Sequence, residues 1–136
     1  ICVDIIKDGY EIFMEVFHPK NTEFYLTEGD ELKGIEDKSV DLIFSMDSLC
    51  RCDGITIGKY ISEIFRVLKP NGKICVHLPC LASEGSVKLG FTPVELQALQ
   101  EYCEKHVPDN YNIALDLITI GHGVLLRGKP IEKEVK

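Results

Sequence analysis

The 136-residue sequence lacks a long apolar run and lacks an excess of positive charge. No stretch is long enough to cross a bilayer, and the chain does not begin with the basic, apolar and small-residue succession of a signal peptide. It has 15 Lys and Arg against 22 Asp and Glu, a net charge of -7, which disfavours contact with a phosphate backbone or an anionic membrane. We therefore expect a cytoplasmic protein that binds neither nucleic acid nor membrane.

The sequence also lacks internal repeats, low-complexity tracts and an opening methionine. With 45% hydrophobic residues it suits one globular domain with a genuine core. We assign that domain to residues 1–128 and a charged tail to 129–136. Because the chain opens directly on the apolar Ile1, we expect the domain to be truncated at its start. The six cysteines lie within expected strands and helices, so reduced thiols are expected rather than disulfides.

Hydrophobic periodicity predicts strands that alternate with helices. The nearly continuous apolar run at 40–45 is typical of a parallel strand covered on both faces, and we expect it to be central. The aromatic residues Tyr10, Phe13 and Phe17 are expected to form the buried face of a helix. The expected strands are 1–6, 24–26, 40–45, 73–78, 113–120 and 124–127, and the expected helices are about 10–17, 57–68 and 92–105.

This alternation predicts an α/β fold, with a mostly parallel sheet and helices on both faces. The last two strands are separated by Gly121, His122 and Gly123, a short glycine-rich link that favours an antiparallel hairpin at the end of the domain. Thr92, Pro93 and Glu95 have the pattern of a helix start.

Two phrases between residues 40 and 79 narrow the fold further. The first is Val-Asp-Leu-Ile-Phe-Ser, and the second is Glu-Ile-Phe-Arg-Val-Leu-Lys-Pro-Asn-Gly. The second combines, in fixed order, the apolar positions of a helix, a proline that ends the helix and a turn. Together they closely resemble the fourth strand and the helix before the fifth strand of class I, Rossmann-like S-adenosylmethionine-dependent methyltransferases. The resemblance extends over about residues 2–128 and implies S-adenosylmethionine as cofactor.

The resemblance also implies a set of cofactor-binding residues. Asp4, followed by Ile5, matches the acidic residue that accepts hydrogen bonds from the two ribose hydroxyls, and a carboxylate has two oxygens for two donors. Gly29 and Asp30, followed by Glu31, match a pair that meets the adenine. The resemblance further implies that the methionine portion is bordered by Ser45 and Met46.

One element of the family has no counterpart in the sequence. The first strand and its glycine-rich cofactor loop should precede Asp4, and nothing precedes Ile1. In the family this strand lies between the second and fourth strands. We therefore expect either a gap in the sheet or a rearranged strand order, and little or no activity from these residues alone.

Methyl transfer is an in-line displacement in which the protein mainly aligns the acceptor with the methyl group. Asp47 and His77, near the ends of two strands, are the candidates for a catalytic base, and His122 is a weaker one. Each has a structural alternative: Asp47 as a helix cap, His77 as a hydrogen-bonded core residue and His122 as a turn residue. The alternative for Asp4 is that it only begins the following helix, and the alternative for Asp30 is an ordinary turn after Gly29.

Cys50, Cys52, Cys75 and Cys80 invite a metal interpretation, but their spacing is not that of a structural zinc site, and we expect no metal.

The leading hypothesis is methyl transfer to a small-molecule or saccharide-like acceptor, whose pocket would include the loop 80–90. An inactive methyltransferase-like module that binds a partner is the alternative. A nicotinamide-dependent oxidoreductase is a third hypothesis, which the phrase at 66–72 disfavours.

Overall fold

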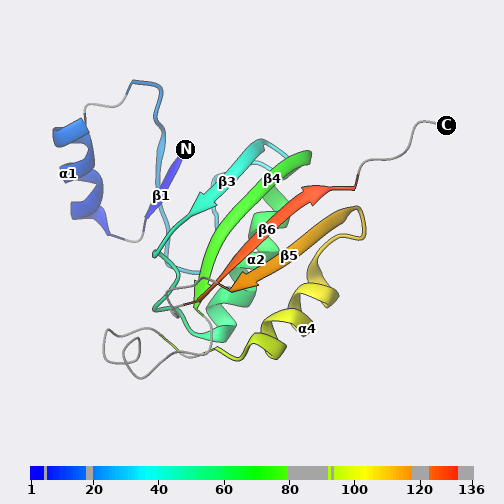
Figure 1. Ribbon diagram of the computed structural model, residues 1–136. Helices are drawn as coiled ribbons and strands as arrows, with labels where there is room; N and C mark the ends of the chain where they lie inside the picture. Colours follow the sequence, from blue (N-terminus) through cyan, green and yellow to red (C-terminus); the bar gives the residue numbers. More distant parts are fainter. Residues whose placement is uncertain (5, 18–19, 80–91, 93, 118–122, 132–136) are drawn as a thin grey trace.

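The strands of the described residues form two separate β-sheets (Figure 1). The computed structural model describes residues 1–4, 6–17, 20–79, 92, 94–117 and 123–131. The smaller sheet pairs β1 (Cys2–Asp4) with β2 (Phe24–Leu26) in parallel, and the helix α1 (Lys7–Phe17) connects them. This β-α-β step confirms the start of the expected alternation.

The larger sheet has four strands in the order β3-β4-β6-β5. β3 is parallel to β4, whereas β6 is antiparallel to both β4 and β5. The antiparallel hairpin is therefore confirmed, as is an open α/β fold with mixed strand directions. The strands are β3 (Val40–Ser45), β4 (Leu68–Pro79), β5 (Tyr111–Leu117) and β6 (Gly123–Pro130).

The expectation that residues 40–45 form a central strand covered on both faces is wrong. β3 lies at the edge of the larger sheet, and Leu42 and Phe44 are 61% and 65% exposed. A continuous apolar run indicates what a strand can bury but does not supply the neighbour that covers it. Within the described residues no strand lies between β1 and β3. The sheet thus has the expected gap, and the strand order has not rearranged to close it.

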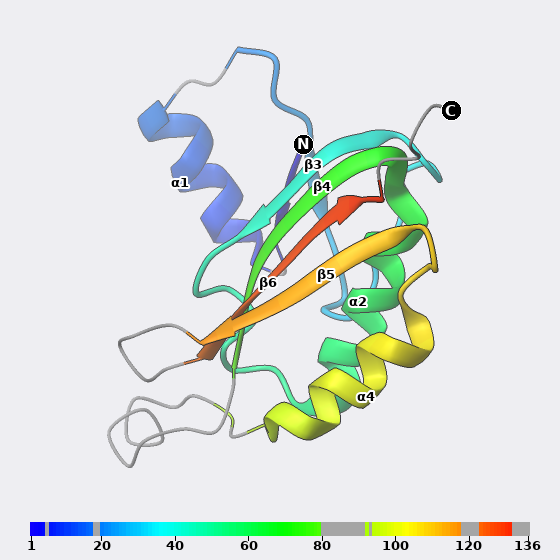
Figure 2. The same cartoon turned by 45° about the vertical axis from the view of Figure 1, so that its right-hand side comes forward.

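The core lies between the larger sheet and two helices, α2 (Gly54–Val67) and α4 (Leu96–His106). Figures 1 and 2 show both helices on the same face of this sheet, with α1 on the far side of β1 from them. Ile57, Ile61 and Ile64 on α2 are almost fully buried, as their helical spacing predicts. They pack against apolar side chains of β4 and β6, among them Ile74, Val76, Leu78 and Leu126.

α1 does not bury an aromatic face, which corrects a second expectation. None of its residues is buried, and Phe17 is among the exposed large side chains. Tyr10 instead packs on Phe24 of β2 with ring centroids 4.6 Å apart, and Phe13 packs on Phe17 at 5.4 Å. The two short strands beside α1 offer too little surface to cover the helix.

Two boundaries also differ from the sequence analysis. β6 includes Lys129 and Pro130, which we had assigned to the tail. α4 begins at Leu96, and the Thr92 hydroxyl donates to the Arg51 carbonyl instead of capping that helix. Among the described helices, none is long and apolar enough to span a membrane.

Candidate functional site

A cavity of about 510 Å³ lies between the two sheets, with β1 on one side and β3 on the other. Asp4, Gly29, Ser45 and Met46 all line it. The structure thus brings together four residues that the family resemblance assigns to cofactor binding. The walls deeper between the strands are mainly apolar, with contributions from Leu32, Ile35, Val40, Leu42, Ile43, Ile64 and Val67.

Asp4 ends β1 and lies directly before α1. Its Oδ1 accepts a hydrogen bond from the Ile6 amide at 3.1 Å. Gly9 approaches the same carboxylate so closely that a Cβ at that position would lie 3.3 Å from Oδ2. Asp4 therefore has a local structural role as well as its place at the cavity. Ile5 lies outside the described residues.

Gly29 has the backbone geometry that favours glycine, with φ at 103°. Its amide donates to the Thr27 hydroxyl at 3.3 Å, which fixes the turn after β2 at the cavity wall. The next two residues point elsewhere. Asp30 forms an ion pair with Lys59 of α2, and Glu31 lies 3.7 Å from Lys33. Both acidic residues line a second, more open hollow beside α2.

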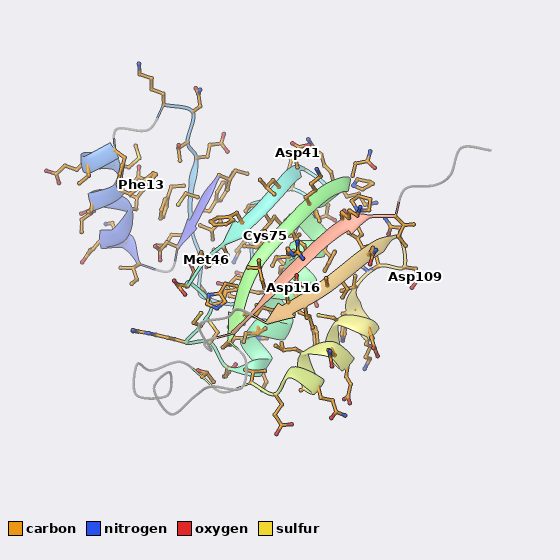
Figure 3. The ribbon with its side chains drawn as sticks, viewed as in Figure 1. Phe13, Asp41, Met46, Cys75, Asp109 and Asp116 are labelled. Carbon is orange, nitrogen blue, oxygen red and sulfur yellow. The ribbon has the colours of Figure 1, made fainter. Side chains whose placement is uncertain are left out.

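Ser45 and Met46 lie at the carboxyl end of β3, where ligands bind in open α/β sheets. Ser45 pairs with Val76 of β4. Figure 3 shows Met46 just beyond the end of β3, and it is 44% exposed. These residues reach the same cavity as Asp4 from the opposite side.

Asp47 and His77 are in direct contact. His77 Nδ1 lies 2.9 Å from Asp47 Oδ1 and 3.4 Å from the Asp47 amide nitrogen. The Asp47 side chain is 71% exposed, whereas His77 is 3% exposed. The helix-cap interpretation of Asp47 is wrong, because Asp53 caps α2 by accepting from the Thr56 amide at 2.8 Å. This hydrogen bond from the Thr56 backbone amide is also the main reason why the pKa of Asp53 is lowered.

Cys50 completes this cluster, and no pattern in the sequence groups it with Asp47 and His77. Its Sγ lies 3.3 Å from His77 Nδ1 and 3.9 Å from Asp47 Oδ1. Burial, followed by the charge of Asp47, raises the pKa of the Cys50 thiol to about 11. The spacing of Asp47 and Cys50 fits a turn, but nothing in the sequence links the turn to a histidine on another strand.

Three of the four cysteines considered for zinc, Cys50, Cys52 and Cys75, lie within the described residues. The described cysteines are all free thiols, and only Cys50 of that set joins a group of possible metal ligands. Cys80 lies outside the described residues, as do His122 and the expected acceptor loop at 80–90.

The side chains of Glu63 and Arg66, which belong to the second of the two sequence motifs, stabilise the fold. The Arg66 guanidinium bonds to both carboxylate oxygens of Glu63 at 2.7 Å, to Asp37 at 2.6 Å and to the Ile35 and Leu32 carbonyls. Glu63 accepts in turn from the Leu32 amide at 2.9 Å. This clamp fastens the loop between β2 and β3 to α2, and so holds one wall of the cavity.

Comparison with known proteins places these features in a family. Residues 1–76 match the family described as Methyltransferase domain. Phosphoethanolamine N-methyltransferase 1 of Triticum aestivum is 29% identical over 123 residues, which cover 85% of this chain and 24% of that enzyme. The chain thus spans about a quarter of the length of this curated relative.

Solved structures share the fold at low sequence identity. A protein from Pyrococcus horikoshii OT3 matches with a TM-score of 0.68 and 20% identity, over 95% of this chain and 70% of its own. A SAM dependent methyltransferase from Archaeoglobus fulgidus matches with a TM-score of 0.65 and 15% identity, over 93% of this chain and 74% of its own. The phrases, the cavity and these matches agree, and the chain belongs to the Methyltransferase domain family of class I S-adenosylmethionine-dependent enzymes.

Proposed function

We propose that the protein to which this chain belongs transfers a methyl group from S-adenosylmethionine to a small-molecule acceptor. The observation that carries the proposal is the convergence of Asp4, Gly29, Ser45 and Met46 on one cavity at the carboxyl ends of β1 and β3. Membership of the family supports the reaction class. The net charge of -7 supports a small acceptor over a nucleic acid, and a cytoplasmic location remains our expectation.

The residues present fit one part of the cofactor. Asp4 has a carboxylate at the cavity wall for two ribose hydroxyls, and the left-handed turn at Gly29 leaves room for a flat ring to approach the backbone. A contact of Asp30 with the adenine amino group stays a prediction of the family resemblance, because this side chain pairs with Lys59 and lines the second hollow. Ser45 and Met46 would border the methionine portion. When bound, the cofactor supplies an electrophilic methyl group on its sulfonium.

Asp47 is the residue that we propose to meet the acceptor. It is exposed and directly follows Met46, and its φ of 57° is a left-handed conformation that non-glycine residues seldom adopt. Its carboxylate suits an acceptor that is cationic or must lose a proton. His77 is buried, so we propose that it acts through Asp47, whose carboxylate and amide it contacts.

Two acceptor classes follow. An amino alcohol phosphate is favoured by the name of the wheat relative, and its ammonium group complements the Asp47 carboxylate. A saccharide-like acceptor remains the second class, because a hydroxyl must lose a proton to a base. Methyl transfer assays with phosphoethanolamine and with a panel of sugars separate the two.

Calorimetric titration with S-adenosylhomocysteine tests the cofactor assignment. We expect no detectable heat of binding from these 136 residues. Among the described residues, no strand that could carry a glycine-rich turn lies between β1 and β3. With a strand and a glycine-rich turn of the family's kind added before Ile1, we expect binding. Asp4→Asn in that longer protein should weaken it, and the matched change Asp8→Asn on α1 should not. Failure of the longer protein to bind contradicts the methyltransferase proposal.

The alternative is an inactive module that assembles with a partner. The observation that favours it is the edge of β3, where Leu42 and Phe44 are exposed beside an unpaired strand. A longer protein that binds no cofactor but elutes as a stable complex would support this module.

A further inference from the structure

The Asp47, Cys50 and His77 cluster contains three different donor atoms that face one another. The carboxylate oxygen, the sulfur and the imidazole Nδ1 all lie within 4.8 Å of one another. The measured separations are 2.9 Å from nitrogen to oxygen, 3.3 Å from nitrogen to sulfur and 3.9 Å from sulfur to oxygen. Two of these residues come from the turn after β3 and the third from β4.

These separations are close to those of a tetrahedral metal site. Metal–ligand distances of about 2.0 to 2.1 Å for nitrogen and oxygen and about 2.3 Å for sulfur imply ligand separations of about 3.4 to 3.6 Å. Each observed distance differs from this by roughly half an ångström or less. Small side-chain rotations would therefore place all three atoms around one ion without moving the sheet.

The imidazole Nδ1 of His77 has two neighbours that cannot both hydrogen-bond to it. His77 Nδ1 faces the Asp47 carboxylate, which requires a donor, and also the Asp47 amide, which is itself a donor. One ring nitrogen cannot donate and accept at the same time. A cation among the three atoms would use the Nδ1 lone pair, the carboxylate and the sulfur together.

The burial pattern also fits a site that is closed on one side. Cys50 and His77 are 1% and 3% exposed, while the Asp47 side chain is 71% exposed. Three protein ligands with one face toward solvent leave a fourth position for water or another small ligand.

We infer that Asp47, Cys50 and His77 form a binding site for a divalent zinc ion with an open fourth position. The combination of thiolate, imidazole and carboxylate favours zinc over magnesium or calcium, which prefer oxygen ligands. On binding, the Cys50 thiol releases its proton to the buffer, and the ion exchanges bound water for the three protein ligands. This site is distinct from the acceptor role proposed for Asp47, because a carboxylate bound to the ion no longer takes up a proton, and its test requires no cofactor.

Cobalt titration of the full chain tests the inference, after removal of metal with a chelator. Co²⁺ is the probe because it adopts the same geometry and shows thiolate-to-cobalt charge transfer and visible bands typical of tetrahedral coordination. We expect these bands to saturate at one ion per chain and to disappear when Zn²⁺ is added. No saturable band, or bands of octahedral oxygen coordination only, would overturn the site.

Variants identify the ligands. Cys50→Ser should remove the charge-transfer band. Asp47→Asn should lower cobalt affinity by more than about 100-fold, the upper end of the loss caused by removing a residue that only hydrogen-bonds to a ligand. Asp47 is exposed, so its variant keeps the test valid if Cys50→Ser fails to fold. Cys52→Ser is the matched control, because this nearby thiol is outside the cluster. Equal loss in Cys52→Ser, or full binding in Asp47→Asn, contradicts the assignment.

Discussion

His77 Nδ1 lies 2.9 Å from the carboxylate of Asp47, which joins the turn after β3 to the neighbouring strand β4. The buried imidazole also lies 3.4 Å from the Asp47 amide nitrogen. The backbone at Asp47 is left-handed, a conformation that persists only when its surroundings hold it. This pair therefore fixes an exposed carboxylate next to the cavity that we assign to the cofactor.

Loss of the Asp47 carboxylate should impair methyl transfer in the longer protein. We expect Asp47→Asn to lower kcat/KM by about 10² to 10⁴-fold if the carboxylate takes a proton. His77→Gln should lower kcat less and leave the cofactor affinity unchanged, because it acts through Asp47. Initial rates across pH, together with cofactor titration, separate the two effects. Asp109→Asn, at an exposed position, is the control, and an equal rate for Asp47→Asn and wild type would refute the assignment.

Helix α2 contacts α4 at a glycine that has no room for a side chain. A Cβ at Gly58 would lie 2.9 Å from the Tyr102 ring, whose hydroxyl donates to the Gly58 carbonyl at 2.8 Å. We expect Gly58→Ala to lower the free energy of unfolding by about 1 to 3 kcal/mol. Gly54→Ala, on the same helix, meets nothing within 4 Å and should be neutral or stabilising by up to about 1 kcal/mol. Denaturant unfolding measures both, and equal effects would exclude crowding as the cause.

The clamp of Arg66 and Glu63 should make stability depend on acid pH. The hydrogen bond from Arg66 is the main reason why the pKa of Glu63 is lowered from 4.5. The resulting stabilisation is complete above the unfolded pKa and is lost as pH falls through the lower folded value. Glu63→Gln should therefore flatten the acid limb of the stability curve. Glu104→Gln, on the exposed side of α4, should leave that limb unchanged in urea unfolding at several pH values.

Replacing the Arg66 guanidinium in the same clamp should lower the stability of the fold. Arg66→Lys removes the fork that bonds to both Glu63 oxygens and to two loop carbonyls. We expect it to lower the free energy of unfolding by about 1 to 3 kcal/mol. Thermal unfolding checks the change, and a variant as stable as wild type would contradict the structural role.

Buried thiols should react slowly with alkylating agents. Burial raises the pKa of Cys50 and of Cys103 to about 11, so roughly a thousandth of each is thiolate at pH 8. Half-exposed Cys2 and Cys75 should be modified first. Mass spectrometric mapping after brief iodoacetamide treatment gives the order. The contrast should vanish in denaturant, and early modification of Cys103 in the folded chain would contradict the packing.

Local patterns predicted the elements of this fold well. The apolar stripe of α2 and the short glycine-rich link expected after β5 are signals contained in neighbouring residues, and helix α2 and the antiparallel pairing of β5 with β6 are confirmed. The position of β3 was mispredicted because coverage of a strand depends on its neighbours in space, not on its own residues. For the same reason the aromatic face of α1 was wrongly expected to be buried.

The residues of the candidate site were likewise predictable only in part. Asp4, Gly29, Ser45 and Met46 were implied by the family resemblance, and they line one cavity, as expected for residues at or near the carboxyl ends of strands. The contact of Cys50 with His77 spans 27 positions and has no signature in the sequence. Nor does the sequence reveal that Lys59 is paired with Asp30, because the two residues meet only after α2 packs.

The separation of the two sheets has a consequence for the cooperativity of unfolding. No ladder of backbone hydrogen bonds joins β1 to β3 in the described part of the chain. The β1-β2 unit is instead coupled to the rest by side-chain packing, the loop clamp and the ion pair of Asp30 with Lys59. Such a unit opens at a lower free energy than the core around α2 and β4. Amide protons of β1 and β2 should exchange with solvent first, which makes this unit the first subglobal unfolding event of the chain.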